Sequence, residues 1–194
     1  MIFIAIAGPS GAGKTTLASF LTANFRDEFE HIRQDDYLRH PDEFPMKGKY
    51  KNWEHPHNYK FEVLYEHLKK LKQGEKVLSR TFAPDETVEP HEFYLEPKQY
   101  ILVDGSLILT NEDVASMFDK KFYMDIPPEL MIERRRTRSN HFGIDTEEYD
   151  REVTIPEFER HGMVQKLQAD HIVDGTRDPK TIAHEVRELI LKPK

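Results

Sequence analysis

The sequence contains no cysteine, and this absence excludes several kinds of site. Disulfide bonds, thiolate metal centres and cysteine nucleophiles cannot form in a chain of 194 residues that has none. A cysteine-free chain fits a reducing compartment, so we expect a cytoplasmic protein. At this length we also expect a single domain with one core, over residues 1–194.

The sequence also lacks a long apolar run and an excess of positive charge. The apolar stretch at residues 1–7 is too short to span a bilayer, and no basic segment precedes it as in a signal peptide, so we expect no membrane partner. The 28 basic and 35 acidic residues give a formal net charge of −7, which disfavours general binding to nucleic acid. The composition leaves the oligomeric state open.

What the sequence does contain is an alternation of short apolar runs and amphipathic stretches. Because strands that alternate with helices form a mainly parallel sheet covered on both faces, the sequence predicts an α/β fold. We expect strands at residues 2–7, 31–33, 77–82, 100–103, 122–126 and 171–173. We expect helices at residues 15–25, 61–72, 128–138, 156–169 and 179–191, with Val63, Leu64, Leu68 and Leu71 of the second helix facing inward.

Three segments carry no clear period. Residues 39–58 are rich in His, Pro, Lys and aromatic side chains, and a segment this long in a compact domain is more often functional than filler. Residues 83–97 are predicted to form an edge hairpin or a loop. Residues 139–155 are polar, and we expect them to be mobile.

Residues 8–15 form a glycine-rich turn between the first predicted strand and the first predicted helix. They read Gly-Pro-Ser-Gly-Ala-Gly-Lys-Thr and fit G-x-x-x-x-G-K-[ST] at every fixed position. Glycines let backbone N–H groups approach phosphate oxygens, and the following helix directs its positive end at the anion. A glycine turn with a surface lysine is the alternative. The strand before the turn and the helix after it favour nucleotide binding.

The residues of this phosphate loop have separate expected parts in binding ATP with Mg²⁺. Lys14 reaches the β- and γ-phosphates, the Thr15 hydroxyl binds Mg²⁺ and Thr16 bonds the α-phosphate. The candidate nucleotide-binding residues here are Gly8, Ser10, Gly11, Ala12, Gly13, Lys14, Thr15 and Thr16. The absence of an Asn-Lys-x-Asp run disfavours a GTPase, and the short chain disfavours a large ATPase.

Three aspartates are expected beside the phosphate loop. Asp35 and Asp36 follow Lys14 at the distance of one helix and a return to the sheet, and Asp104 ends an apolar strand. Phosphoryl transfer to an alcohol needs a carboxylate that accepts the hydroxyl proton, and Asp35 is the candidate. Asp104 stands where a P-loop enzyme keeps an acid for magnesium. Capping or turn formation is the alternative for all three, and for Asp36 it is nearly as well supported.

Two further groups of residues favour a kinase. The predicted helix at residues 128–138 carries Arg134, Arg135, Arg136 and Arg138, which would repel one another unless anions lie nearby. A solvated face paired with neighbouring glutamates is the alternative. Trp53 and Glu54 offer a flat ring and a carboxylate, as a nucleoside needs for its base and its ribose. A tryptophan that fills the core is an equally supported alternative, and the sequence leaves both open.

With these motifs the chain resembles the uridine kinase and nicotinamide riboside kinase family of P-loop kinases. The resemblance begins with the phosphate loop at residues 8–16 and with Gln34-Asp35-Asp36-Tyr37, which is similar to the family's base motif. Asp104-Gly105 takes the place of a Glu-Gly pair. Residues 55–56 and 64–68 are similar to uridine kinases, whereas residues 134–138 and 174–176 look more like nicotinamide riboside kinases.

The resemblance implies a P-loop three-layer α/β/α sandwich with a five-stranded, mainly parallel sheet and a helical arginine lid. It places the acceptor and lid segments at about residues 39–60 and 134–155. The implied catalytic residues are Asp35, Lys14 and Arg135, and the implied metal ligands are Thr15, Asp35 and Asp104. The resemblance assigns Arg135, Arg138, Asp174, Gly175 and Thr176 to ATP. It assigns Asp35, Asp36, Tyr37, Trp53, Glu54, Arg136, Asn140 and His141 to the acceptor.

The expected activity is transfer of the ATP γ-phosphate to the 5′-hydroxyl of a ribonucleoside, either uridine- or cytidine-like or nicotinamide riboside-like. Two departures concern the acceptor and the metal, because Glu54 stands in place of the family's usual aspartate and Asp104 in place of its glutamate. One alternative is a related kinase of another alcohol, such as pantothenate or a sugar phosphate. Another is an ATP-binding regulatory protein without transfer activity.

Overall fold

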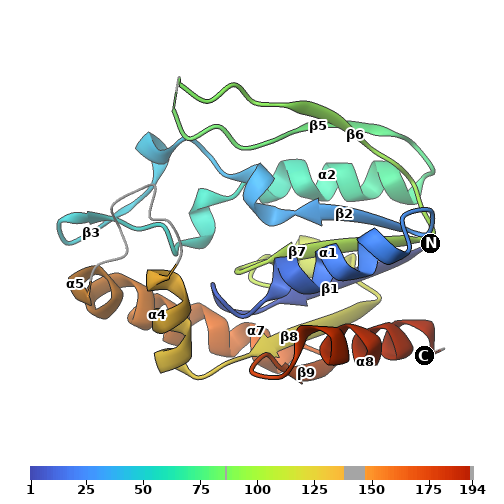
Figure 1. Ribbon diagram of the computed structural model, residues 1–194. Coiled ribbons are helices and arrows are strands. Elements are labelled where there is room, and N and C mark those ends of the chain that lie inside the picture. Colours follow the sequence, from blue (N-terminus) through green and yellow to red (C-terminus); the bar gives the residue numbers. More distant parts are fainter. Residues whose placement is uncertain (86, 138–146, 193–194) are drawn as a thin grey trace.

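The protein is built on a five-stranded parallel sheet, as expected. The computed structural model describes residues 1–85, 87–137 and 147–192. The strand order is β2-β7-β1-β8-β9, and every neighbouring pair runs parallel (Figure 1). The strands are β1 (Ile2–Ala7), β2 (Phe29–Arg33), β7 (Tyr100–Gly105), β8 (Lys120–Asp125) and β9 (His171–Asp174).

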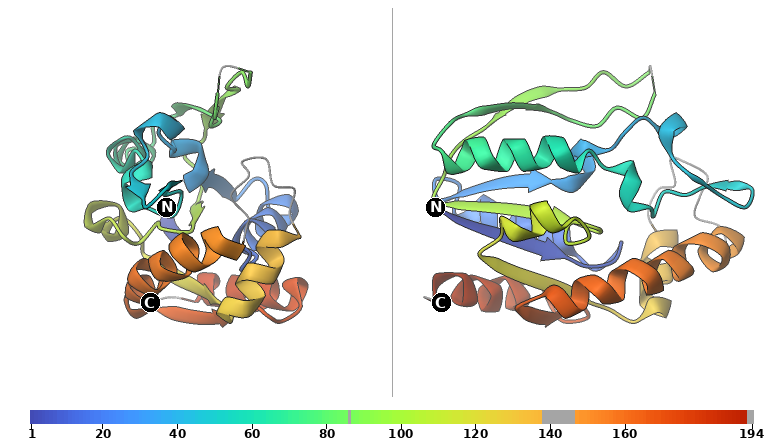
Figure 2. Two further views of the ribbon diagram at one scale, coloured as in Figure 1. Left: turned by 90° about the vertical axis from the view of Figure 1, so that its left-hand side faces the viewer. Right: turned by 180° about the vertical axis from the view of Figure 1, so that it is seen from behind.

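Helices cover both faces of this sheet and make three layers. One face carries α1 and α8, and the other carries α2, α3 and α7 (Figures 1 and 2). The bounds are α1 (Lys14–Asn24), α2 (Phe61–Lys72), α3 (Glu112–Ser116), α7 (Met163–Gln168) and α8 (Pro179–Leu191). The fold is therefore the three-layer α/β/α sandwich that the sequence predicts.

The central strands are apolar without alternation because both of their faces are buried. Along β1, Ile4 and Ile6 lie in the core cluster with α1 and α8, whereas Phe3 and Ala5 lie in the cluster with α2 and α3. All four side chains are at most 1% exposed. A strand buried on both sides needs no polar face, which explains the continuous apolar run in the sequence.

Helix α2 matches its expected bounds, but one of its residues points the other way. Leu64, Leu68 and Leu71 are fully buried, whereas Val63 is 38% exposed. The expectation for Val63 was wrong because it lies one position off the i, i+4, i+7 stripe that faces the sheet. Gly74 follows the helix with φ +83°, a left-handed conformation that ends it.

Two short pairs of strands lie outside the main sheet. A hairpin forms with other bounds than expected, because β5 (Val77–Arg80), which precedes the predicted range of residues 83–97, pairs with β6 (Glu92–Leu95) within it. It forms a separate antiparallel sheet and does not extend the central one. In the expected acceptor segment, β3 (Met46–Lys47) pairs with β4 (Tyr50–Lys51). Three 3₁₀ turns flank these strands, at Gln34–Tyr37, Pro41–Glu43 and Pro56–Asn58.

Beyond α4 (Pro128–Arg136), the polar segment at residues 139–155 is described only from residue 147 on, and this part is helical. Residues 147–168 form α5 (Glu147–Tyr149), a π-helical turn (Asp150–Thr154), α6 (Ile155–Glu157), a second π-helical turn (Phe158–Gly162) and α7. Tyr149 and Val153 are fully buried. They lie one turn apart among charged residues, so few apolar residues mark the buried face. The π-helical turns also interrupt the 3.6-residue spacing by which an amphipathic helix is recognised in a sequence.

This helical segment is tied to the acceptor segment by side chains. The Tyr149 hydroxyl accepts a hydrogen bond from the Trp53 backbone N–H at 3.1 Å, and its ring packs edge-on against Tyr50. Lys47 pairs with Glu157 at 2.6 Å. Tyr149 and Glu157 are both buried, so these links hold the two segments against one another.

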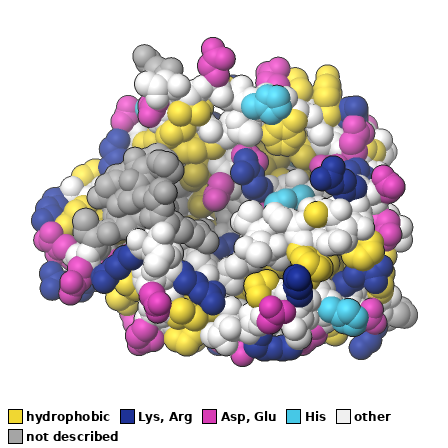
Figure 3. Space-filling view, in the orientation of Figure 1, with side chains coloured by type: hydrophobic (Ala, Val, Ile, Leu, Met, Phe, Trp, Pro, Cys, Tyr) yellow, Lys and Arg dark blue, Asp and Glu magenta, His cyan; other side chains and the backbone are white. Residues whose placement is uncertain are grey.

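The described surface is mixed in character. On the face shown in Figure 3, basic and acidic side chains are interspersed, and apolar side chains appear between them. Among the described residues, no helix combines the length and the apolar character that crossing a membrane requires.

Lys120 generates a prediction about stability. Its side chain is buried at the start of β8, and its ammonium group donates to the carbonyl oxygens of Leu189, Ile190 and Lys192 at the end of α8. These carbonyls have no partner within the helix. Lys120→Met should lower the free energy of unfolding by about 2 kcal/mol, measured by urea denaturation. Lys121→Met, at the half-buried next position, is the control and should change it by less than about 0.5 kcal/mol.

Candidate active site

The candidate site lies where three neighbouring strands end. In the sheet register Ile6 of β1 and Arg33 of β2 both pair with Asp104 of β7. The phosphate loop, the turn that carries Asp35 and the acid Asp104 therefore meet at one edge, on the left of Figure 1. In open α/β sheets this carboxyl edge is the place where ligands bind.

The phosphate loop has the backbone that its glycines permit. Gly8, Gly11 and Gly13 have φ values of +143°, +84° and +93°, which side chains with a Cβ rarely adopt. A Cβ on Gly8 would lie 2.5 Å from the carbonyl oxygen of Met124. Gly13 is the N-cap of α1, so the positive end of that helix faces the loop. The loop forms a concave cradle of the kind that holds phosphate.

Lys14 and Thr15 follow the loop on the first turn of α1. The Lys14 ammonium group reaches back over the loop and donates to the carbonyl oxygen of Pro9 at 2.9 Å. The Thr15 hydroxyl donates to Asp104 Oδ2 at 2.7 Å. Both side chains line one pocket with Asp35 and Asp104, so the structure brings together the four polar residues expected to act on phosphate and metal.

Asp104 is buried and held on both carboxylate oxygens. Its Oδ1 lies 2.8 Å from His31 Nε2, while its Oδ2 accepts the bond from Thr15. Burial by itself would raise the pKa of the Asp104 carboxyl group. The hydrogen bond and charge of His31, the Thr15 hydroxyl and the nearby Lys14 outweigh burial and lower that pKa. Asp104 is therefore an anion at neutral pH.

Asp35 lies across the pocket from the phosphate loop. Its position is set by Gln34, whose buried side chain packs under Gly105 and accepts the Leu107 N–H at 3.0 Å. Crowding by protein atoms raises the pKa of the Asp35 carboxyl group, Lys14 opposes this rise and Asp104 adds to it. Asp35 is nevertheless exposed to solvent in the pocket.

The pocket around these residues has room for a small acceptor. Its volume is about 430 Å³, and it extends from the phosphate loop to Trp53, Glu54 and Tyr59. Trp53 is half-buried and packs edge-on against Phe44, with ring centroids 4.9 Å apart. The Tyr59 hydroxyl lies 3.4 Å from Ser106 Oγ at the pocket wall. The expected aromatic ring and carboxylate thus face the same cavity as Asp35.

Asp36 and Tyr37 do not reach this pocket. Asp36 pairs with the Arg33 guanidinium at 2.6 Å, and the Tyr37 hydroxyl lies 2.9 Å from His67 Nδ1. Both line a different pocket, between α2 and the β5–β6 hairpin. The 3₁₀ turn at residues 34–37 explains the difference, because consecutive side chains on a tight turn point in different directions.

Arg135 and Arg136 lie near the acceptor end of the site. Arg135 is buried, and its guanidinium pairs with Glu54 at 3.0 Å and lies 3.7 Å from Asp150. Arg136 is more exposed and lies 3.4 Å from the other Asp150 oxygen. The structure thus places Arg135, expected at ATP, against the carboxylate expected at the ribose. Arg138, Asn140 and His141, which were also expected in the site, lie outside the described residues.

A second pocket lies on the other side of the phosphate loop. Its volume is about 510 Å³, and its lining combines loop residues and Thr16 with Gly175 and Thr176. Asp174 is not part of the lining but holds the turn by accepting bonds from Thr176 at 2.9 and 2.6 Å. A Cβ on Gly175 would come within 2.9 Å of the Ala12 carbonyl oxygen. The pocket is suited to the rest of a nucleotide whose phosphates occupy the loop.

The residues present fit ATP and magnesium. The loop can pack against β8 in this shape only because Gly8 has no Cβ, which would overlap the Met124 carbonyl oxygen. Across the described ranges no cluster of three or more His, Asp or Glu residues would hold a metal on its own. Mg²⁺ usually takes one or two protein ligands and completes its shell with substrate phosphates and water, so Thr15 and Asp104 form a suitable set.

Sequence reasoning missed two residues of the site. His31 precedes Arg33 by two positions on β2, so both side chains lie on the same side of the strand. This spacing was the feature of the sequence that could have indicated His31. Arg134 donates to the carbonyl oxygens of Gly11 and Gly175, at 3.0 and 3.2 Å, and so joins the phosphate loop to the turn after β9. No feature of the arginine run indicates which member makes this contact.

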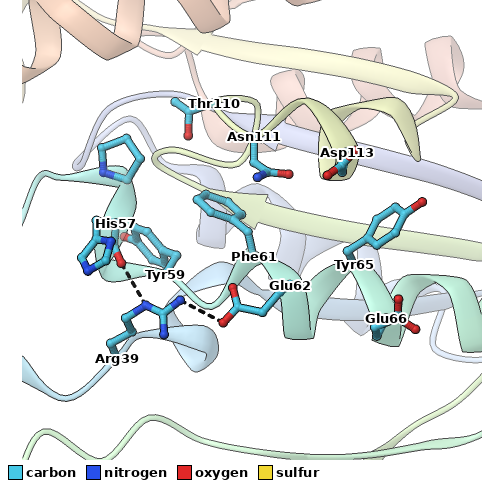
Figure 4. A pocket seen from close by; sticks show the side chains of 11 residues that line it. Arg39, His57, Tyr59, Phe61, Glu62, Tyr65, Glu66, Thr110, Asn111 and Asp113 are labelled. Carbon is cyan, nitrogen blue, oxygen red and sulfur yellow. Dashed lines mark hydrogen bonds and ion pairs between the residues drawn. The ribbon is translucent and has the colours of Figure 1, made fainter. Parts of the chain in front are cut away.

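Figure 4 shows a further pocket of about 480 Å³ between the start of α2 and α3. Arg39 bonds Glu62 at 2.8 Å and the His57 carbonyl oxygen at 3.1 Å across it. It is similar in volume to the pocket around Asp35, but it contains no phosphate-loop residue. The chemistry of the lining therefore distinguishes the two pockets.

Comparison with known proteins agrees with this geometry. Residues 3–181 match the family described as phosphoribulokinase / uridine kinase. The chain belongs to the phosphoribulokinase/uridine kinase family. Members of this family that resemble it are named kinases, so the protein is a phosphotransferase with an alcohol group as acceptor. Membership also implies ATP as the phosphate donor, normally with magnesium.

Two of the relatives are named as kinases of nucleosides. A nicotinamide riboside kinase of Saccharomyces cerevisiae is 25% identical over 98% of the chain and 88% of its own length. A uridine kinase of Brevibacillus brevis is 32% identical over 71% of the chain and 65% of its own length. The structure of a possible uridine kinase from Bacillus stearothermophilus has a TM-score of 0.62 at 19% identity, covering 89% of this chain and 88% of that one, and it supports the fold.

Gly8 provides a test of the phosphate loop. Gly8→Ala should lower the free energy of unfolding by about 3 kcal/mol, because backbone strain and overlap with the Met124 carbonyl add together. Gly48→Ala is the matched control, since Gly48 also has a positive φ, +59°, but has no atom within 4 Å of the added Cβ. It should cost about 1 kcal/mol. Equal losses in urea denaturation would contradict the close approach at Gly8.

Proposed function

We propose that this kinase transfers the γ-phosphoryl group of ATP to the 5′-hydroxyl of a ribonucleoside. One observation carries the proposal: Lys14 and Thr15 of the phosphate loop, the Asp35 carboxylate and the Trp53 ring line a single pocket. Such a pocket holds the end of a triphosphate and an alcohol side by side. Holding two reactants in this way removes much of the entropy cost of their meeting.

Asp35 serves as the proton acceptor in this proposal. The acceptor hydroxyl oxygen forms a bond to the γ-phosphorus while the bond from that phosphorus to the β,γ-bridging oxygen breaks. The electron pair of the broken bond stays with ADP, and the hydroxyl proton passes to the Asp35 carboxylate. Lys14 stabilises the charge on the phosphate oxygens, and Mg²⁺ held near Thr15 and Asp104 supplies further positive charge there.

The acceptor end of the pocket supports a nucleoside. Trp53 offers a ring face for stacking the base, and the Glu54 carboxylate accepts hydrogen bonds from ribose hydroxyls. Glu54 is fixed by Arg135 at 3.0 Å, which leaves its second oxygen for the ribose. The glutamate side chain, which is longer than the family's usual aspartate, thus reaches Arg135 on α4 and also faces the acceptor.

The lining of the pocket also suits a nucleoside whose base carries a positive charge. The pocket combines the rings of Trp53, Tyr59 and Phe82 with the carboxylates of Asp35 and Glu54. Aromatic faces and carboxylates together attract a pyridinium cation, as in nicotinamide riboside. The relative that covers nearly the whole chain is a nicotinamide riboside kinase, and this supports the same candidate. Uridine and cytidine are the neutral candidates.

The test is an acceptor panel with ATP and magnesium. We expect ADP release and a 5′-phosphorylated product with uridine, cytidine or nicotinamide riboside, and none with 5′-deoxyuridine, which lacks the accepting hydroxyl. Turnover with pantothenate or a sugar phosphate but with no nucleoside would contradict the proposal. ATP binding without transfer to any member would favour the regulatory alternative.

Asp35→Asn should remove the base while leaving the phosphate loop intact. We expect kcat to fall by about 10³-fold with little change in ATP affinity, since a positioned general base contributes about 10²–10⁴-fold. Asp36→Asn is the matched control, because the Asp36 carboxylate pairs with Arg33 and faces a different pocket. Its kcat should stay within about threefold of the wild type, a shift of less than 1 kcal/mol. Equal effects of the two changes would remove Asp35 from its role.

A further inference from the structure

His31 makes a contact that the proposed reaction does not explain. It lies on β2, where it pairs in register with Leu102, and its ring reaches along the neighbouring strand to Asp104. The side chain is 17% exposed, and its Nε2 atom lies 2.8 Å from Asp104 Oδ1. A histidine at this place joins the outer strand of the sheet to the acid beside the phosphate loop.

We propose that His31 is a positioning residue that sets the affinity of the site for the magnesium–nucleotide complex by orienting Asp104. The inference rests on the proposed function, since it assumes that Thr15 and Asp104 face the metal. It concerns a residue that acts through Asp104 and not on the reacting atoms. The orientation of the Asp104 carboxylate is set by its hydrogen bond with His31, and not by burial alone.

The hydrogen bonds determine which atoms remain available to the metal. An ionised carboxylate can only accept, so both Thr15 Oγ1 and His31 Nε2 must donate to Asp104. The Thr15 hydroxyl proton therefore points at Asp104, and the lone pairs of Thr15 Oγ1 are left for a cation. With Oδ2 alone engaged, the Asp104 carboxylate could rotate and release that proton. The bond to His31 prevents this rotation.

The fit around Asp104 is close as well as polar. Its side chain is 5% exposed and lies between Thr15 and the imidazole of His31. A change at Asp104 therefore disturbs the contact with His31, and a change at His31 acts through Asp104. Changing both side chains should cost less affinity than the sum of the two single changes.

The first experiment measures metal binding without turnover. Mn²⁺ is titrated into the protein with a non-hydrolysable ATP analogue and followed by electron paramagnetic resonance. His31→Phe keeps a ring and a good strand former but removes the donor, and it should weaken Mn²⁺ binding about 10–100-fold, the usual effect of losing such an outer partner. His31→Gln keeps an N–H donor at the same reach and should stay within about threefold.

The outcomes separate this inference from the proposed function. If the wild type binds no Mn²⁺ with the analogue, the proposed function fails and the inference fails with it. If the wild type binds and His31→Phe binds equally well, the inference alone is overturned. Equal weakening by Phe and Gln would show that any change at His31 disturbs the strand, and this also contradicts an orienting hydrogen bond.

The second experiment tests whether His31 acts through Asp104. Asp104→Glu and His31→Ala should each weaken Mn²⁺ binding about 10-fold or more. Because the orienting bond is already disturbed in Asp104→Glu, adding His31→Ala should weaken binding by no more than about threefold further. Thermal denaturation of each variant gives its folded fraction. Strictly additive losses would show that the two side chains act independently and would overturn the proposal.

Discussion

The site depends on a balance of charge at one edge of the sheet. Asp35 and Asp104 face the same pocket, and each anion disfavours the other. Lys14 is the main charge that opposes the rise in the pKa of Asp35, whereas at Asp104 His31 and Thr15 lower the pKa more than Lys14 does. The strand register imposes the arrangement, because parallel strands deliver their carboxyl ends to a common line. The fold therefore brings two carboxylates close enough to repel one another and places Lys14 beside them.

The parts of the structure that the sequence predicts well are those set by local pattern. The bounds of β1, α2 and α8 agree with the expected ones, because their apolar spacing and their Pro and Gly boundaries are local signals. The phosphate loop belongs to the same class, since its glycines are required by backbone angles. The five-stranded parallel sheet was expected from the resemblance to P-loop kinases, and the order of its strands was not predicted.

The parts that the sequence does not predict depend on distant neighbours. Asp35 and Asp36 are adjacent and chemically identical, and only the packing of Gln34 under Gly105 decides which one faces the phosphate loop. Tyr149 looks like part of a polar stretch because its partner, Trp53, lies far away in the chain. Such contacts are tertiary, and neither residue type nor spacing encodes them locally.

The bond between Tyr149 and Trp53 links two segments that are far apart in the chain. The helical segment at residues 147–168 and the loop that carries Trp53 share buried contacts, and Lys47 and Glu157 add an ion pair between them. A shift of one segment alone would separate these polar partners, which costs free energy because they are buried. The Trp53 loop and the helical segment are therefore expected to move as one unit.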